Sequence, residues 1–136
     1  MTPADVLVIF GITGDLAKVM TFRSLYRLER RGLIDCPIVG VAVDDWTLEQ
    51  LVQRARESIV GTGEELDEAV FGRLAARFSY VAGDFADDAT YGRVAKAIEG
   101  KRTPVFYLEI PPFLFGTVIM GVVGAGAPKS ARFVFE

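Results

Sequence analysis

Short apolar runs alternate along this chain with longer stretches in which apolar residues recur at helical spacing. The apolar runs cover residues 5–10, 37–43, 79–83, 104–110 and 131–136. Near-continuous apolar runs of this length are typical of parallel strands whose two faces are both covered. Strands that alternate with helices form βαβ units with right-handed crossovers, which leaves few topologies open. The pattern therefore predicts an α/β fold: a doubly wound parallel sheet of about five strands in the order 3-2-1-4-5, between two helical layers.

The stretches between the strands predict helices over residues 14–31, 47–59, 64–78, 87–100 and 112–126. On the first of these, Met20 follows Leu16 by four residues. Val19 and Met20 are therefore interpreted as core contacts on the buried face of that helix. Asp44 and Asp45 precede the second helix, where they either cap it or serve a ligand.

Composition excludes several classes of function. The 136 residues are 51% hydrophobic, which is enough for one domain with a real core over residues 1–136. The net charge is −3 with acidic and basic residues interspersed, so no nucleic-acid or membrane-surface partner is indicated. No apolar run approaches the roughly 20 residues that span a bilayer. Histidine is absent, so no histidine-ligated metal site is expected, and the lone Cys36 fits a reducing cytoplasm.

The segment GITGDLA lies between the first strand and its helix. It is a G-x-x-G-x-x-A variant of the dinucleotide-binding turn of Rossmann-like folds, with Gly11, Gly14 and Ala17 at the three fixed positions. Gly11 would allow the tight turn, Gly14 would let a pyrophosphate approach the backbone, and Ala17 would let helix and strand pack closely. Free N–H groups at the helix start would face the phosphates, and Lys18 would add a positive charge. The simpler interpretation is that two glycines only make a tight turn.

Three segments, GITGDLAKVMTFRSLYRLERRGL, PIVGVA and VFYLEIPPFLFGTV, resemble the N-terminal part of glucose-6-phosphate dehydrogenases. The resemblance covers essentially the whole chain and implies an NAD(P)-binding coenzyme domain. Such an enzyme transfers a hydride from C1 of glucose 6-phosphate to a nicotinamide and yields 6-phosphogluconolactone in the pentose phosphate pathway. The resemblance also implies that the full-length protein is a cytoplasmic homo-oligomer. The alternative on the same fold is a non-catalytic dinucleotide-binding module or sensor.

The resemblance implies which residues contact the coenzyme. The matching positions are Gly11, Ile12, Thr13, Gly14, Asp15, Leu16, Ala17 and Lys18 in the turn and helix start, Val43 and Asp44 after the second strand, and Pro111, Pro112 and Phe115 in a Pro-Pro turn beside the nicotinamide. A cis bond before one of the two prolines is expected, although the pair can also simply end the strand. Glu109 is interpreted as a solvated charge near the end of the fourth strand rather than a catalytic group.

The chain departs from the family pattern at two places. Where the family commonly has a basic pair, this chain has Val19 and Met20, so a contact to the substrate phosphate or the coenzyme is missing. The family's arginine for the 2′-phosphate of NADP is replaced by Val43, and Asp44 follows it. An acid here accepts hydrogen bonds from a free ribose hydroxyl and repels a 2′-phosphate. The coenzyme is therefore NADP or NAD, with a local preference for NAD.

The family's catalytic histidine lies in a later segment that this chain does not contain. The resemblance therefore implies that the chain holds no catalytic residue. The chain is expected to be a truncated piece of the enzyme that lacks the substrate-binding domain and is inactive by itself.

Overall fold

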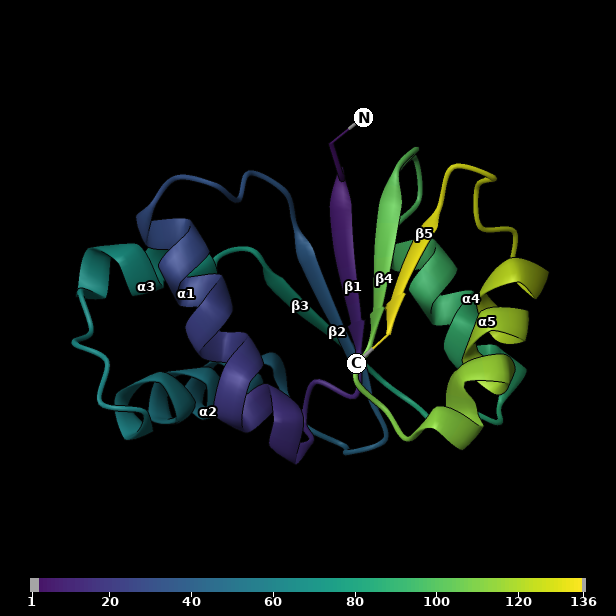
Figure 1. Ribbon diagram of the computed structural model, residues 1–136. Helices are drawn as coiled ribbons and strands as arrows, with labels where there is room; N and C mark the ends of the chain where they lie inside the picture. Colours follow the sequence, from purple (N-terminus) through teal and green to yellow (C-terminus); the bar gives the residue numbers. More distant parts are fainter. Residues whose placement is uncertain (1–2, 136) are drawn as a thin grey trace.

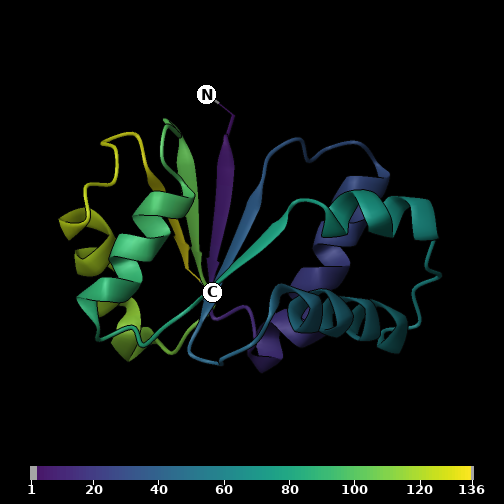
Figure 2. The same ribbon diagram turned by 180° about the vertical axis from the view of Figure 1, so that it is seen from behind.

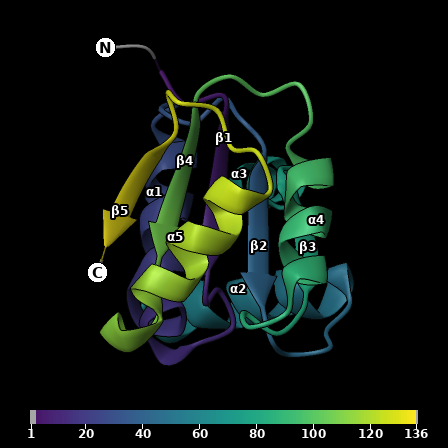
Figure 3. The same cartoon turned by 90° about the vertical axis from the view of Figure 1, so that its right-hand side faces the viewer.

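Figure 1 shows the computed structural model of the chain, in which residues 3–135 are described. The strands are β1 (Val6–Phe10), β2 (Ile38–Ala42), β3 (Phe78–Ala82), β4 (Pro104–Leu108) and β5 (Arg132–Phe135). They form one parallel sheet within the described residues, in the order β3-β2-β1-β4-β5. Figure 3 shows β5 at the edge of this sheet, separated from β1 by β4. The doubly wound sheet and its predicted strand order are confirmed.

Helices enclose the sheet on both sides, as Figures 1 and 2 show from opposite directions. On one side lie α1 (Phe22–Arg30), α2 (Leu48–Gly61) and α3 (Glu68–Ala75), and on the other α4 (Asp88–Ala97) and α5 (Phe115–Gly124). A π-helical turn, η1 (Ala17–Thr21), precedes α1, and a 3-10 turn, η2 (Pro112–Leu114), precedes α5. Each predicted helix is present, with ends that differ by a few residues.

The core has two apolar layers, one on each face of the sheet. Successive side chains of a strand point to opposite faces, so Ile9 joins the layer under α1, α2 and α3, while Phe10 joins the layer under α4 and α5. Neither side chain is more than 1% exposed. This double burial is the reason why the strands read as continuous apolar runs rather than alternating ones.

The start of the first helix differs from the prediction. In η1 the N–H of Phe22 bonds to the carbonyl of Ala17, a wider turn than that of an α-helix. Ala17 and Phe22, both 0% exposed, make the core contact. Leu16 and Met20 do share a face, but that face borders an open groove. Met20 is 57% exposed and Val19 62% exposed, so their interpretation as core contacts was wrong.

The residue that caps α2 is not one of the two aspartates that the sequence offered as possible caps. Thr47 is the N-cap residue: its side chain accepts a hydrogen bond from the N–H of Gln50, while the Gln50 side chain accepts one from the N–H of Thr47. This reciprocal capping box satisfies the free donors at the helix start. Neither Asp44 nor Asp45 is therefore needed to cap α2.

Candidate functional site

The turn after β1 contains two glycines, Gly11 and Gly14, which have different roles in it. Gly11 has a φ of +88°, and a Cβ placed on it would lie 2.1 Å from the carbonyl oxygen of Glu109 in the neighbouring segment. Only glycine meets both conditions, because a side chain there would be strained and would collide with backbone. Gly14 donates its N–H to the carbonyl of Gly11 at 2.9 Å. A Cβ on Gly14 would lie 3.2 Å from the same oxygen, which is crowded but open towards solvent.

A pocket of about 280 Å³, which we call the turn pocket, lies where β1, β2 and β4 end. It is lined by Gly11, Thr13, Gly14, Ala42, Val43, Asp44, Phe85, Glu109, Ile110, Pro111 and Leu114. The order of the sheet reverses between β1 and β4, and ligands of doubly wound proteins bind outside the carboxyl ends of the strands at this point. The turn pocket therefore occupies the expected place of a ligand site.

Asp44 is fixed at the β2 side of the turn pocket. Its Oδ1 accepts a hydrogen bond from the Thr13 hydroxyl at 2.9 Å, which ties the end of β2 to the glycine turn. Its backbone carbonyl accepts a hydrogen bond from the Tyr80 hydroxyl. Burial, with smaller contributions from Asp44 and Asp45, raises the pKa of Tyr80 to about 12. Tyr80 therefore stays neutral at physiological pH and keeps its proton for this hydrogen bond.

Arg54 joins the same network from α2, although no sequence motif marks it. Its Nη2 donates to the carbonyl oxygen of Thr13 at 3.2 Å. Its guanidinium carbon lies 5.7 Å from the centre of the Trp46 ring, within the range of a cation–π contact. A positive charge and an aromatic face thus lie beside the turn on the side of Asp44.

Six of the predicted coenzyme residues line the turn pocket: Gly11, Thr13, Gly14, Val43, Asp44 and Pro111. The side chain of Ile12 points instead into the core, where a Cβ on Gly40 would approach it to 2.8 Å. Ala17 is buried in the same layer. Asp15, Leu16 and Lys18 are exposed around the start of the helix, outside the lining of the turn pocket.

The Pro-Pro turn closes the opposite side of the turn pocket. The expectation of a cis bond was wrong, because residues 3–135 contain no cis peptide. Pro111 has φ −56° and ψ 141°, the extended conformation favoured before a proline, and Pro112 then begins η2. Phe115 does not line the turn pocket but packs on Phe135, with ring centres 4.7 Å apart. Leu114 takes the position beside the pocket instead.

Glu109 is not the solvated charge that the sequence suggested, since it is only 8% exposed. Its Oε2 accepts a hydrogen bond from the Thr21 hydroxyl, which links the end of β4 to η1. Val105, Tyr107 and Glu109 alternate along β4 and share one face. A sequence argument from this alternation alone would have placed Glu109 with the apolar side chains.

This face of β4 is the floor of an open groove of about 470 Å³, which we call the apolar groove. It is lined by Leu7, Ile9, Leu16, Met20, Thr21, Ser24, Leu25, Leu28, Val105, Tyr107, Glu109 and Val134. Among the described residues of this lining, Glu109 is the one with an ionisable side chain of the acidic or basic kind, and it also lines the turn pocket. It therefore marks the junction between the two spaces.

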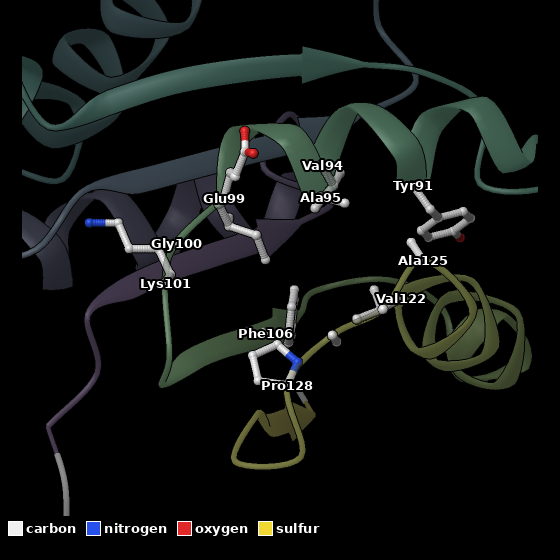
Figure 4. Close-up of a pocket in the computed structure, with 13 residues that line it drawn as sticks. Tyr91, Val94, Ala95, Glu99, Gly100, Lys101, Phe106, Val122, Ala125 and Pro128 are labelled. Carbon is white, nitrogen blue, oxygen red and sulfur yellow. The ribbon is translucent and has the colours of Figure 1, made fainter.

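A third space, of about 220 Å³, lies between α4, α5 and β4 and is shown in Figure 4. Gly100, Lys101 and Pro128 border it, and these residues precede β4 and β5, so the cavity lies at the amino ends of the strands. In Figure 4 the charged ends of Glu99 and Lys101 point away from the apolar side chains of the lining. We assign no ligand to this cavity, because it is at the opposite edge of the sheet from the turn pocket.

Residues 3–135 offer neither a metal cluster nor a membrane-spanning helix. No group of three or more His, Cys, Asp or Glu side chains there is arranged to hold a metal ion. No helix in the same residues is long and apolar enough to cross a membrane.

The comparison with known families agrees with the geometry. Residues 8–136 match the family model described as glucose-6-phosphate dehydrogenase, NAD binding domain. The chain belongs to the glucose-6-phosphate dehydrogenase family. The resemblance seen in the three sequence segments is thereby confirmed, and a nicotinamide dinucleotide is the cofactor class that the matched domain indicates.

Individual members of the glucose-6-phosphate dehydrogenase family show the same relationship. Glucose-6-phosphate 1-dehydrogenase 1 of Mycobacterium tuberculosis is 52% identical over 133 residues, which cover 98% of this chain and 28% of that enzyme. The enzyme of Dickeya dadantii is 34% identical over 135 residues, covering 96% of this chain and 28% of that enzyme. These relatives are oxidoreductases, and the chain spans about 28% of their length.

Solved structures of the glucose-6-phosphate dehydrogenase family have the same fold. The crystal structure of the Mycobacterium avium enzyme superposes with a TM-score of 0.94 at 53% identity, over 98% of this chain and 29% of that one. A second enzyme, solved in complex with its substrate glucose-6-phosphate, superposes with a TM-score of 0.83 at 26% identity, over 99% of this chain and 31% of that one.

Proposed function

We propose that the chain binds a nicotinamide dinucleotide across the turn pocket, as the coenzyme domain of an enzyme that oxidises glucose 6-phosphate to 6-phosphogluconolactone. The observation that carries this proposal is the glycine turn, which lies at the reversal point of the sheet and leads directly into a helix start. Membership of the family supports the reaction, and one structural neighbour is described as a complex with glucose-6-phosphate. The nicotinamide, when bound, supplies the hydride acceptor.

The residues present fit such a ligand. The Gly14 N–H is used inside the turn, so a pyrophosphate would meet the amides of the following residues, Asp15 and Leu16, at the helix start. Lys18, exposed on this first turn, adds positive charge. Ile12 and Ala17 contribute indirectly, because their burial holds the turn against the core.

The two ends of the dinucleotide are proposed to lie on opposite sides of this turn. Thr13, Val43 and Asp44 would receive the adenosine ribose at the end of β2, and Pro111 with Leu114 would border the nicotinamide half beyond β4. The proposed contacts of Pro112 and Phe115 with the nicotinamide rest on the family match, since neither lines the turn pocket.

We propose no catalytic group within this chain, which has no histidine. We expect no turnover of glucose 6-phosphate by the chain alone, because hydride transfer also needs residues that bind the sugar and remove its proton. The alternative of a non-catalytic dinucleotide sensor would bind the same ligand. Sequencing of the longer protein separates the two: a histidine-containing catalytic segment would support the enzyme, and its absence would support the sensor.

The compartment and the assembly are also part of the proposal. Cys36 is the one cysteine of the sequence, and burial raises the pKa of its thiol. A half-buried protonated thiol without a partner for a disulfide suits the reducing cytoplasm, where this pathway would operate. We propose a homo-oligomer for the full-length enzyme on the family resemblance alone.

We further propose that NAD binds at least as tightly as NADP. Asp44 is held at the adenosine end by the Thr13 hydroxyl, in the position of an acid that accepts from a free ribose hydroxyl. Val43 supplies no positive charge for a 2′-phosphate. Arg54 is a cation in the same network, but its guanidinium is already held by the Thr13 carbonyl and Trp46.

Replacement of Val43 by arginine is expected to shift the ratio of NAD to NADP affinity by about 10- to 100-fold towards NADP, the value of one charge-assisted contact. Val43 is 66% exposed, so the longer side chain fits without disturbing the core. Calorimetric titration of both coenzymes into the unaltered chain and the variant measures the ratio.

The matched control for this substitution is Val60→Arg, an exposed valine near the end of α2 outside the turn pocket. It should leave the ratio unchanged. Tenfold tighter binding of NADP by the unaltered chain would refute the preference for NAD. An unchanged ratio in Val43→Arg would show that the adenosine ribose binds elsewhere.

A further inference from the structure

Arg54 makes two contacts that both lead to the residues around Asp44. Its Nη2 donates to the carbonyl oxygen of Thr13 at 3.2 Å, and its guanidinium carbon lies 5.7 Å from the centre of the Trp46 ring. The Thr13 hydroxyl donates to Oδ1 of Asp44 at 2.9 Å, and the N–H of Trp46 donates to the Asp44 carbonyl, also at 2.9 Å. The four residues therefore form a closed circuit of contacts, in which Arg54 lies opposite Asp44.

Thr13 benefits from such a support because of its place in the glycine turn. It lies between Gly11 and Gly14, and glycine restricts the backbone less than any other residue. The Thr13 carbonyl is held instead by a side chain of α2, which lies 41 positions further along the chain. The orientation of Thr13, and with it the position of the Asp44 carboxylate, therefore depends on a tertiary contact as well as on the turn itself.

The helix α2 is a rigid base for Arg54. It begins with a reciprocal capping box, and Leu51 and Ala55, on either side of Arg54, are 0% exposed. Side chains that project from a packed helix hold a site more precisely than side chains on loops. Arg54 itself is half-buried, so its hydrogen bond to Thr13 is partly shielded from competition by water.

We propose that Arg54 is a positioning residue for coenzyme specificity: through Thr13 it holds the Asp44 carboxylate where a free 2′-hydroxyl of the adenosine ribose donates to it. The inference rests on the proposed function, because it requires the adenosine ribose at the end of β2. Arg54 is not part of the lining of the turn pocket, so it acts through Thr13 and Asp44 rather than by touching the coenzyme. Its loss should weaken ligands with a free 2′-hydroxyl and spare those that carry a 2′-phosphate.

The other use of a cation at this end of the turn pocket is a direct contact with the 2′-phosphate of NADP. The two roles predict opposite changes when Arg54 is replaced. Loss of a positioning residue lowers the ratio of NAD⁺ to NADP⁺ affinity, whereas loss of a phosphate ligand raises it. The contacts of the guanidinium with the Thr13 carbonyl and the Trp46 ring favour the positioning role.

Arg54→Lys is the most informative variant, because it keeps the positive charge but not the geometry. The lysine side chain is shorter and lacks the planar fork of arginine, so the hydrogen bond to the Thr13 carbonyl is lost. The probes are NAD⁺, NADP⁺ and ADP-ribose, which has a free adenosine 2′-hydroxyl and no nicotinamide. We expect NAD⁺ and ADP-ribose affinities to fall about three- to tenfold and NADP⁺ affinity to change less than about twofold. Calorimetry with the 136-residue chain measures all three.

Two further variants separate geometry from charge. Arg54→Met removes the charge as well as the hydrogen bond, and should lower the ratio of NAD⁺ to NADP⁺ affinity to a similar extent as Arg54→Lys. Arg56→Lys is the matched control on the same helix: the Arg56 Nη1 donates to Glu68 at 2.7 and 2.8 Å, and its guanidinium carbon lies 4.6 Å from the centre of the Phe71 ring. These contacts are with α3 and not with the turn, so the ratio should remain that of the unaltered chain.

A double-mutant cycle with Asp44→Ala tests whether Arg54 acts through Asp44. In a chain that already lacks this carboxylate, Arg54→Lys should change neither the NAD⁺ affinity nor the ratio any further, because nothing remains to be positioned. A merely structural role of Arg54 would instead weaken the binding of all three ligands equally, with or without the Asp44 carboxylate.

The outcomes distinguish this inference from the proposed function. An unchanged ratio in Arg54→Lys, a raised ratio in Arg54→Met, or an equal loss of affinity for the three ligands would overturn the inference and leave dinucleotide binding intact. An undiminished effect of Arg54→Lys in the Asp44→Ala chain would overturn it as well. Failure of the unaltered chain to bind NAD⁺, NADP⁺ and ADP-ribose would overturn the proposed function and this inference together.

Discussion

Replacement of Gly11 by alanine is expected to destabilise the fold by about 2–5 kcal/mol, the sum of a left-handed backbone penalty and an overpacking penalty. The added Cβ would lie 2.1 Å from the Glu109 carbonyl oxygen, which belongs to the main chain and has no alternative rotamer. The end of β1 would have to separate from the segment after β4. Urea unfolding of the variant, followed by far-UV circular dichroism, measures the loss.

Gly100→Ala is the matched control, because Gly100 has a similar φ of +83° but nothing within 4 Å of the added Cβ. Its cost should be limited to the backbone penalty, about 1–2 kcal/mol. Equal losses in the two variants would mean that contact with the Glu109 carbonyl does not constrain the turn.

Gly14→Val is expected to leave the chain folded and to weaken dinucleotide binding by at least about 100-fold. The loss arises because the pyrophosphate can no longer come close to the backbone. Gly14 is exposed and has no left-handed φ, so the cost to the fold is moderate. The branched side chain would occupy the space above the helix start that the phosphates need. Calorimetric titration with NAD⁺ measures the effect.

Gly116→Val is the control for this variant. Gly116 is also exposed in the first turn of a helix, and nothing lies within 4 Å of an added Cβ. It should fold and bind NAD⁺ like the unaltered chain. Survival of binding in Gly14→Val would show that the pyrophosphate is placed incorrectly in this account.

The strand order and the place of the candidate site were predictable because both follow from local patterns. A strand buried on two faces reads as a continuous apolar run, and this was sufficient to locate the strands and their alternation with helices. The glycine turn after the first strand then identified the reversal point, where Gly11, Gly14 and Asp44 do meet in the turn pocket. Neither step required knowledge of contacts between distant side chains.

Other features were not predictable because they depend on tertiary packing. The π-helical turn at η1 changes which residues face the core. The spacing of Leu16 and Met20 therefore correctly placed them on one face of the helix, but that face is exposed rather than part of the core. Arg54 reaches the turn from the middle of α2, forty-one positions beyond its partner Thr13. Glu109 is buried and accepts a hydrogen bond from Thr21 of η1, a segment far away in sequence.

The central claim is that the turn pocket binds the dinucleotide. Its most direct test is a two-dimensional ¹H–¹⁵N NMR titration of the 136-residue chain with NAD⁺. If the dinucleotide binds in the turn pocket, the largest amide shifts occur at Gly11, Gly14, Asp44 and Phe85, while Lys101, beside the cavity of Figure 4, stays unchanged. Shifts centred on that cavity, or no shifts at millimolar NAD⁺, would contradict it.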